Sequence, residues 1–87
     1  MHKTSVIFLI SPASEETNIQ DVEKNVKNIK MDGLTWGEFR KEPLVGKLAR
    51  LRALAVVENK TSVDDLEMKI NNMDLVQSVD IEAMSEI

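Results

Sequence analysis

The order of apolar patterns along this chain predicts an α+β sandwich with the element order β-α-β-β-α-β. Three observations carry the prediction. Four segments have the β-branched or alternating character of strands, and two segments place apolar residues three and four positions apart, as one face of a helix does. In addition, 87 residues are enough for one hydrophobic core and too few for two. We therefore expect residues 1–87 to form a single domain.

The first strand is predicted at residues 6–10, where Val-Ile-Phe-Leu-Ile has the β-branched and aromatic composition of a buried strand. We expect the strand to end at Ser11 and Pro12, because proline cannot donate a hydrogen bond to a strand ladder.

The first helix is predicted at residues 18–30. Thr17 and Gln20 have the spacing of a capping box, and four apolar residues form one stripe, Ile19, Val22, Val26 and Ile29. Asp32 and Gly33 follow and break the helix.

The next two strands are predicted at residues 34–39 and 48–57. The earlier one alternates apolar residues with small or polar ones. The later one is long and expected to be central, with Leu51, Ala53, Ala55 and Val57 on one face and Arg50, Arg52, Leu54 and Val56 on the other. Its alanines would also suit a helix, so the strand assignment depends on Val56, Val57 and the neighbouring elements.

The second helix is predicted at residues 63–72, after the capping pair Ser62 and Asp65 and with the apolar stripe Leu66, Ile70 and Met73. In the last strand Val79, Ile81 and Ala83 alternate with Ser78, Asp80 and Glu82. This alternation ends near Ala83, so the last residues add little to the core. An ordinary chain end frays, so we would interpret Met84, Glu86 and Ile87 as functional if they are ordered on a partner.

Together these elements predict a ferredoxin-like sandwich, in which two helices cover one face of a four-stranded antiparallel sheet. The first strand pairs with the third and fourth, and the second lies at an edge. Both chain ends then lie at one end of the sheet, with the turns at residues 32–33 and 58–61. The uncovered face displays Leu54, Val56 and an apolar pair from the first strand, either Ile7 and Leu9 or Val6 and Phe8, which predicts a partner there.

The composition excludes several kinds of site. Without cysteine the chain has no disulfide, thiolate metal site or cysteine nucleophile, and its one histidine, His2, supplies neither a metal cluster nor a catalytic triad. The three glycines form no phosphate-binding loop, and the longest apolar run is far too short to span a membrane. We therefore expect no catalytic residue, no metal site, no cofactor and a cytoplasmic protein.

Charge is distributed unevenly along the chain. Residues 40–52 carry a local charge of +4, from five basic residues against Glu42, although the whole chain carries −4. The basic residues are Arg40, Lys41, Lys47, Arg50 and Arg52. Such a segment can steer an acidic partner, and it can equally be a solvated surface. Charge alone does not decide between these two interpretations.

Three stretches of the chain resemble a known family. DGLTWG at residues 32–37, VVE at 56–58 and VQSVDIEAM at 76–84 have the order and spacing of the C-terminal guanine-nucleotide exchange domain of translation elongation factor 1 beta. The resemblance covers nearly the whole chain and includes EETN at residues 15–18 and a final hydrophobic residue. That family has the ferredoxin-like fold, in agreement with the apolar patterns.

The resemblance implies a nucleotide exchange factor. Members of the family bind elongation factor 1 alpha, the GTPase that delivers aminoacyl-tRNA, and speed the release of its GDP without making or breaking a covalent bond. The implied partner is this GTPase, with other elongation factor 1 subunits as further candidates and no direct nucleic-acid binding. Eukaryotic members carry an additional N-terminal region, so this chain resembles either a stand-alone form or a trimmed one.

The resemblance also implies where the GTPase is contacted. In the family the C-terminal tail reaches the magnesium and P-loop region, with a lysine before the terminal hydrophobic residue, but here that residue is Glu86. A glutamate cannot displace Mg²⁺ as a cation does. It would instead attract the ion, engage the P-loop lysine, or leave hydrophobic insertion and the wider contacts as the main effects. A second departure is Lys41, where family members commonly have an aromatic residue.

We predict two groups of partner-binding residues from these considerations. The exchange tip and its strand contribute Met84, Glu86, Ile87, Gln77 and Ser78, and the docking surface contributes Lys41, Arg50 and Arg52. Trp36, Gly33 and Gly37 are interpreted as packing and turn residues.

Two other functions are considered. A ferredoxin-like RNA-binding module would need paired aromatic residues on the first and third strands, which are lacking. A regulatory or acylphosphatase-like domain would need an anion-cradling loop after the first strand, and residues 11–14 contain no arginine or glycine for it.

Overall fold

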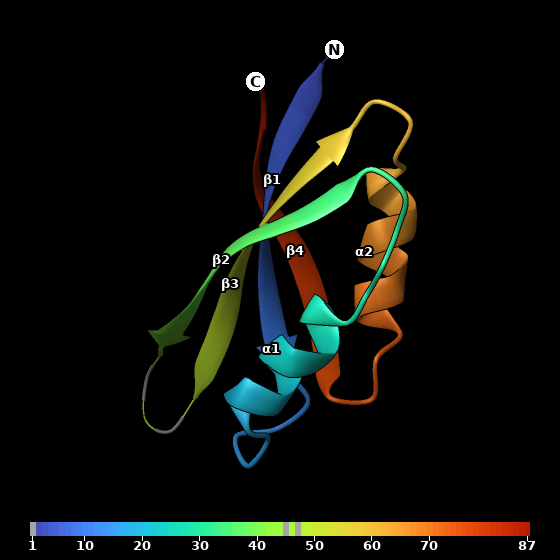
Figure 1. Cartoon of the computed structure of the whole chain (residues 1–87). Helices are drawn as coiled ribbons and strands as arrows, with labels where there is room; N and C mark the ends of the chain where they lie inside the picture. Colours follow the sequence, from blue (N-terminus) through green and yellow to red (C-terminus); the bar gives the residue numbers. More distant parts are fainter. Residues whose placement is uncertain (1, 45, 47) are drawn as a thin grey trace.

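The computed structural model describes residues 2–44, 46 and 48–87. Its elements follow the predicted order: β1 (Lys3–Pro12), α1 (Ile19–Lys27), β2 (Leu34–Pro43), β3 (Ala49–Glu58), α2 (Val63–Asn71) and β4 (Val76–Glu86). The four strands form one antiparallel sheet in the order β2-β3-β1-β4, and both helices pack on one face of it (Figure 1). The predicted ferredoxin-like α+β sandwich is confirmed.

One hydrophobic core fills the space between the sheet and the helices. Alternate residues of β1 and β3 point into it and meet the apolar stripes of α1 and α2. The buried apolar residues are Val6, Phe8, Ile10, Ile19, Val22, Val26, Leu51, Ala53, Ala55, Val57, Leu66, Ile70 and Val76. Each large side chain among them contributes about 1.5–3 kcal/mol by leaving water. The predicted core face of β3 is confirmed.

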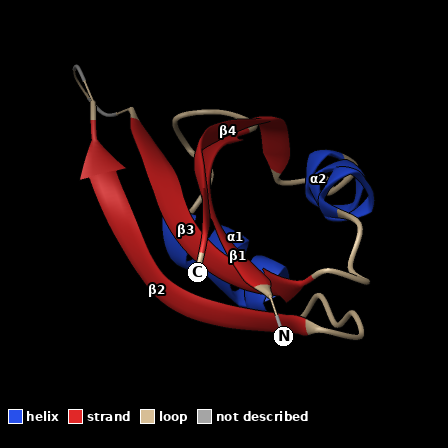
Figure 2. Ribbon diagram, turned by 90° about the horizontal axis from the view of Figure 1, so that it is seen from above, coloured by secondary structure: helices blue, strands red, loops and turns tan. Residues whose placement is uncertain are grey.

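The opposite face of the sheet carries no helix, and we call it the open face. Ile7 and Leu9 of β1 and Leu54 and Val56 of β3 lie on it and are half-buried. The alternative that put Val6 and Phe8 there is excluded, because both are fully buried in the core. The sheet is strongly curved, with β2 and β4 at its two edges (Figure 2).

The boundaries of β1 and α1 differ from the sequence predictions. β1 begins earlier than predicted, at Lys3, and ends as predicted at Pro12, which lies opposite Val76 where a register shift replaces regular pairing. α1 begins later than expected, because its N-cap is Asn18: the Asn18 side chain accepts a hydrogen bond from Gln20 N at 2.8 Å. Thr17 instead lies in the loop before the helix, where its Oγ1 accepts a hydrogen bond from Ser14 N. The predicted capping role of Thr17 is therefore wrong.

β4 is longer than predicted and contains an extra residue. Phe8 opposes Ile81 and Ile7 opposes Ala83, so Glu82 forms a β-bulge. Beyond the bulge the alternation of faces is shifted by one residue. Ala83 therefore lies opposite Ile7 on the open face and not on the core face of Ile81. The predicted face of Ala83 is wrong, and so is the predicted end of the strand, which continues to Glu86.

Trp36 is a packing residue, as predicted. Its ring centroid lies 5.4 Å from that of Phe39 and 6.4 Å from that of Phe8, and its Nε1 donates a hydrogen bond to Ile29 O at 3.2 Å. Trp36 opposes Ala55, a core residue of β3. This aromatic group therefore closes the β2 side of the core.

Gly33 serves the turn between α1 and β2, as predicted. Its φ of +87° lies in the left-handed region, and an added Cβ would lie 2.3 Å from Thr61 Oγ1. Thr61 is buried, and its hydroxyl donates to Asp32 O at 2.7 Å. The turn and the β3–α2 loop thus fit together only without a side chain at this position.

Gly33→Ala is expected to destabilise the domain more than the matched control Gly46→Ala. Both positions have positive φ, which costs a residue with a Cβ about 1–2 kcal/mol. Only at Gly33 would the Cβ also collide with Thr61, whereas no described atom lies within 4 Å of a Cβ at Gly46. Urea denaturation measures both changes in the free energy of unfolding. Equal losses would contradict the steric role of Thr61.

Candidate functional site

The two chain ends lie together at one end of an elongated molecule, whose extents are 43 × 21 × 17 Å (Figure 1). Here β1 and β4 project beyond the helices. Three side chains at the end of β4 are largely exposed, and we call them the C-terminal tip: Met84, Glu86 and Ile87. Met84 is 53% exposed and Ile87 is 69% exposed, so the end of β4 presents apolar side chains to solvent.

The C-terminal tip is held in place by β1. Met84 opposes Val6 and Glu86 opposes Thr4, and Ile87 N donates to Lys3 O at 2.8 Å. These residues therefore do not fray as an ordinary chain end does. Their backbone is ordered by the sheet while their side chains face outward, an arrangement suited to contact with another molecule.

Charged groups surround the C-terminal tip. His2 Nδ1 lies 3.2 Å from Glu86 Oε1, and both side chains are about 70% exposed. In the neighbouring turn Lys60 Nζ lies 3.2 Å from Asp32 Oδ2, and this hydrogen bond, together with the charges of Asp32 and Glu58, raises the pKa of Lys60. The tip thus presents a carboxylate beside two apolar side chains.

Gln77 and Ser78 lie at the other end of β4. Ser78 opposes Ser11, whereas Glu86 opposes Thr4 at the far end of β1. Eight residue-to-residue steps along the strand separate Ser78 from Glu86 by roughly 25 Å. The structure therefore does not bring Gln77 and Ser78 together with the C-terminal tip, although the sequence grouped them.

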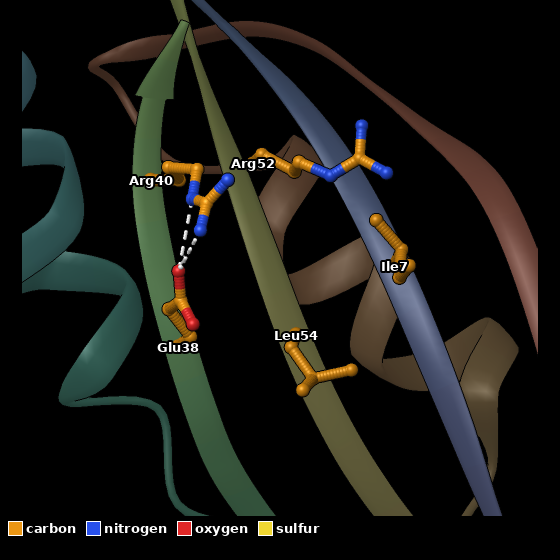
Figure 3. Close-up of a pocket in the computed structure, with 5 residues that line it drawn as sticks. All are labelled: Ile7, Glu38, Arg40, Arg52 and Leu54. Atoms are coloured by element: carbon orange, nitrogen blue, oxygen red, sulfur yellow. Dashed lines mark hydrogen bonds and ion pairs between the residues drawn. The ribbon is translucent and has the colours of Figure 1, made fainter.

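The open face has a shallow hollow of about 200 Å³ near its centre. Ile7 and Leu54 line it with apolar groups, and Glu38, Arg40 and Arg52 supply charged ones (Figure 3). This combination of aliphatic and guanidinium groups can accept an apolar side chain next to an acidic one.

Ion pairs cross the open face between strands. Arg50 Nε donates to Glu42 Oε1 at 2.8 Å, and Arg52 Nη1 lies 3.4 Å from Glu42 Oε2. Arg52 Nη2 also contacts Glu82 Oε2 at 2.5 Å. We call Glu42, Arg50, Arg52 and Glu82 the sheet-face network. It joins β2, β3 and β4, and each of its side chains is about one-third exposed.

The sheet-face network changes the interpretation of the basic segment. Arg50 and Arg52 do lie together, as their spacing predicted, but both are paired with carboxylates. Arg40 is paired as well, with Glu38 Oε1 at 2.9 Å. The sequence missed Glu38 and Glu82 because neither lies among residues 40–52. For Glu38 the available signal was its position two residues before Arg40 on the same strand, and for Glu82 it was the strand order, which brings β4 within reach of β3.

Lys41 lies apart from the two arginines. It opposes Leu51, a core residue, and lines a second hollow with residues of the loop before α1. Lys41 is therefore on the helix side of the sheet, whereas Arg50 and Arg52 are on the open face. Lys47, the remaining basic residue of this segment, lies outside the described residues.

Within residues 2–44, 46 and 48–87 no three histidine or acidic side chains are grouped as a metal site would require. In the same part of the chain, neither helix has the length and apolar character needed to cross a membrane.

The chain is similar in sequence to known proteins. The family model of the EF-1 guanine nucleotide exchange domain matches residues 5–87. The chain is 42% identical over 87 residues to elongation factor 1-beta of Artemia salina and 40% identical over 87 residues to elongation factor 1-beta of Saccharomyces cerevisiae. Each alignment covers 98% of this chain and 42% of the relative. The chain thus spans about two fifths of the length of these curated relatives.

A solved structure has the same fold. The C-terminal domain of the MgtC protein from Mycobacterium tuberculosis aligns with a TM-score of 0.58, covering 98% of this chain and 87% of that one. The two are 14% identical, so this likeness concerns the fold alone.

Glu42→Gln is expected to reduce stability at neutral pH and to have less effect in acid. The hydrogen bond from Arg50, and then the charges of Arg50 and Arg52, hold the pKa of Glu42 below its ordinary value of 4.5. A carboxyl with a lowered folded-state pKa stabilises the fold above its unfolded pKa, and this contribution disappears as pH falls through the folded-state pKa.

Urea denaturation at pH 7 and pH 3, at constant ionic strength, measures this difference. Glu16→Gln, in the exposed loop before α1, is the matched control and should change little at either pH. A Glu42→Gln effect of equal size at both pH values would contradict the role given to the ionised carboxylate.

Proposed function

The chain belongs to the family of EF-1 guanine nucleotide exchange domains, and on this basis we propose that it promotes GDP release from elongation factor 1 alpha. The domain makes and breaks no covalent bond in this activity. The observation that carries the proposal is the family match over residues 5–87, which includes the exposed and sheet-held C-terminal tip.

The physical basis of such an exchange is a coupling free energy. A protein that binds the nucleotide-free GTPase more tightly than the GDP form must weaken GDP binding by the same factor. The C-terminal tip supports this role because β1 already orders its backbone, so little conformational entropy is lost when its side chains enter a partner.

Glu86 defines how this tip would act. Its carboxylate lies beside His2, and Met84 and Ile87 add apolar surface around it. We therefore assign the tip two contributions: an acidic group that competes for the cation and P-loop region of the GTPase, and apolar contacts that hold it there.

The open face and the nearby basic side chains form the proposed docking surface. Its apolar residues Ile7 and Leu54 flank paired arginines, and Lys41 extends the basic character around the β2–β3 end. The tip lies at the other end of the elongated sheet, so docking and exchange would depend on separate groups. Gln77 and Ser78 would then contribute to docking and not to the tip.

The RNA-binding alternative finds no support from the arrangement of aromatic residues. The chain contains one Trp, two Phe and no Tyr. Phe8 is fully buried in the core, and Trp36 and Phe39 oppose the core residues Ala55 and Ala53. The open face therefore lacks the stacking platform that single-stranded RNA needs.

The proposal extends to cellular context. Translation elongation takes place in the cytoplasm, which is the compartment we propose. Other elongation factor 1 subunits are further candidate partners, because the curated relatives contain more than twice the length matched here.

The direct test is a nucleotide release assay. Elongation factor 1 alpha is loaded with fluorescent GDP and mixed with the purified domain and excess unlabelled nucleotide. The proposal requires release to accelerate with domain concentration. An unchanged release rate across micromolar concentrations would overturn it.

Deleting Glu86 and Ile87 is expected to remove most of the acceleration while binding to the GTPase persists. The two side chains are exposed, so their loss takes little from the core. The release assay measures the first effect, and calorimetric binding to nucleotide-free GTPase measures the second. Full exchange by the shortened chain would remove the tip from the mechanism.

Glu86→Lys separates the two ways in which the tip could act. It installs the residue that the family usually has, and if a positive charge at this position is the general mechanism, the variant should match or exceed the parent rate. A large loss of rate would instead show that this domain and its partner depend on an acidic tip.

Lys41→Glu and Arg50→Glu are each expected to slow association with the GTPase and to reduce its dependence on salt. Long-range attraction between charged surfaces acts mainly on the association rate. Lys69→Glu on α2 makes the same change in net charge away from this surface and is the control. Stopped-flow association at several salt concentrations distinguishes an effect of this surface from an effect of net charge. If all three variants behaved identically, net charge alone would explain the result.

A further inference from the structure

The bulge at Glu82 determines which side of the sheet the C-terminal tip faces. Before it, Ile81 opposes the core residue Phe8, and after it, Ala83 opposes Ile7 on the open face. Met84 consequently opposes the core-side residue Val6. Met84 and Glu86 therefore lie on the helix side of the sheet.

Regular pairing would reverse this arrangement. Without an extra residue, Glu82 would oppose Ile7, Ala83 would oppose Val6, and Met84 and Glu86 would move to the open face, because a one-residue slip exchanges the two faces of a strand. The ladder at this point gives Glu82 no partner of its own in β1. Other interactions must offset this missing pair, and one of them is an ion pair made by Glu82 itself.

Arg52 provides that interaction from two strands away. Its side chain extends across β1, as Figure 3 shows, and its Nη2 contacts Glu82 Oε2 on β4. Arg52 is itself fixed on the other side by Glu42 of β2. The guanidinium thus holds the bulged residue against the centre of the sheet, and both side chains of this pair are only about one-third exposed.

We propose that Arg52 and Glu82 are positioning residues for the C-terminal tip: their ion pair holds the bulge, and the bulge places Met84 and Glu86 on the helix side of the sheet. The consequence for nucleotide exchange rests on the proposed function, whereas the consequence for register does not. Bulges near functional sites commonly re-aim a side chain in this way. In this positioning role Arg52 acts within the domain, and the role requires no contact between Arg52 and the GTPase.

Glu82→Gln is the test, with Asp80→Asn as the matched control. Both remove one negative charge from β4, but Asp80 opposes Leu9 within regular pairing and lies outside the sheet-face network. Two-dimensional NMR measures the cross-strand contacts of Val6. The proposal requires Glu82→Gln to gain contacts between Val6 and Ala83 at the expense of Val6 and Met84, and Asp80→Asn to keep the parent pattern.

The exchange assay gives the second readout. At saturating domain, Glu82→Gln should lower the GDP release rate on the order of tenfold, as misplacement of a functional group does, while affinity for the nucleotide-free GTPase changes much less. A parent register in Glu82→Gln, or a loss confined to affinity, would overturn the proposal. If the parent domain promotes no exchange, the NMR register still decides the inference.

Deleting Glu82 gives a second test, which applies even if Glu82→Gln unfolds the domain. With residue 82 removed, regular pairing itself puts Ala83 opposite Ile7 and Met84 opposite Val6, so the tip needs no ion pair to face the helix side. Arg52→Gln should therefore disturb the register in the full chain and leave it unchanged in the deletion variant. Equal disturbance in both would overturn the positioning role.

Discussion

The structure depends on the central strand β1, which pairs with a neighbour along both of its edges. Its alternation puts Val6, Phe8 and Ile10 into the core and Ile7 and Leu9 onto the open face. The same strand pairs with β3 and β4. Residues of these neighbours that lie opposite a core-facing residue of β1 therefore face the helix side of the sheet as well. Core packing of β1 thereby decides which residues β3 exposes, and which residues β4 exposes before the bulge at Glu82.

β1 also connects the core to the C-terminal tip. Its first residues project beyond the helices and pair with β3 on one side and with β4 on the other, and the last residues of β4 depend on this pairing for support. Neither segment buries much apolar surface, so backbone hydrogen bonds carry this part of the sheet. Such a region opens more easily than the core, which allows a partner to adjust it at small energetic cost.

On the open face, ion pairs between strands offset the positive charge that residues 40–52 carry. Arginines that are close in sequence meet carboxylates from other strands, so a segment with a large local charge presents a nearly balanced surface. Exposed pairs of this kind add little stability individually. In the sheet-face network these ion pairs fix the positions of strands. The Arg52 guanidinium on β3 contacts one carboxylate on β2 and one on β4, and so links the two edges of the sheet.

The sequence by itself determined the order of the elements, the core faces of β1 and β3, and the Ser62 cap of α2, because local periodicity and capping are encoded by neighbouring residues. It also identified Met84, Glu86 and Ile87 as a candidate site through family resemblance. It could not reveal the bulge at Glu82, because the alternation of Val79, Ile81 and Ala83 fits a regular strand equally well. Only the tertiary structure decided which face the tip presents and which carboxylates neutralise Arg50 and Arg52, since both depend on register between strands that are distant in sequence.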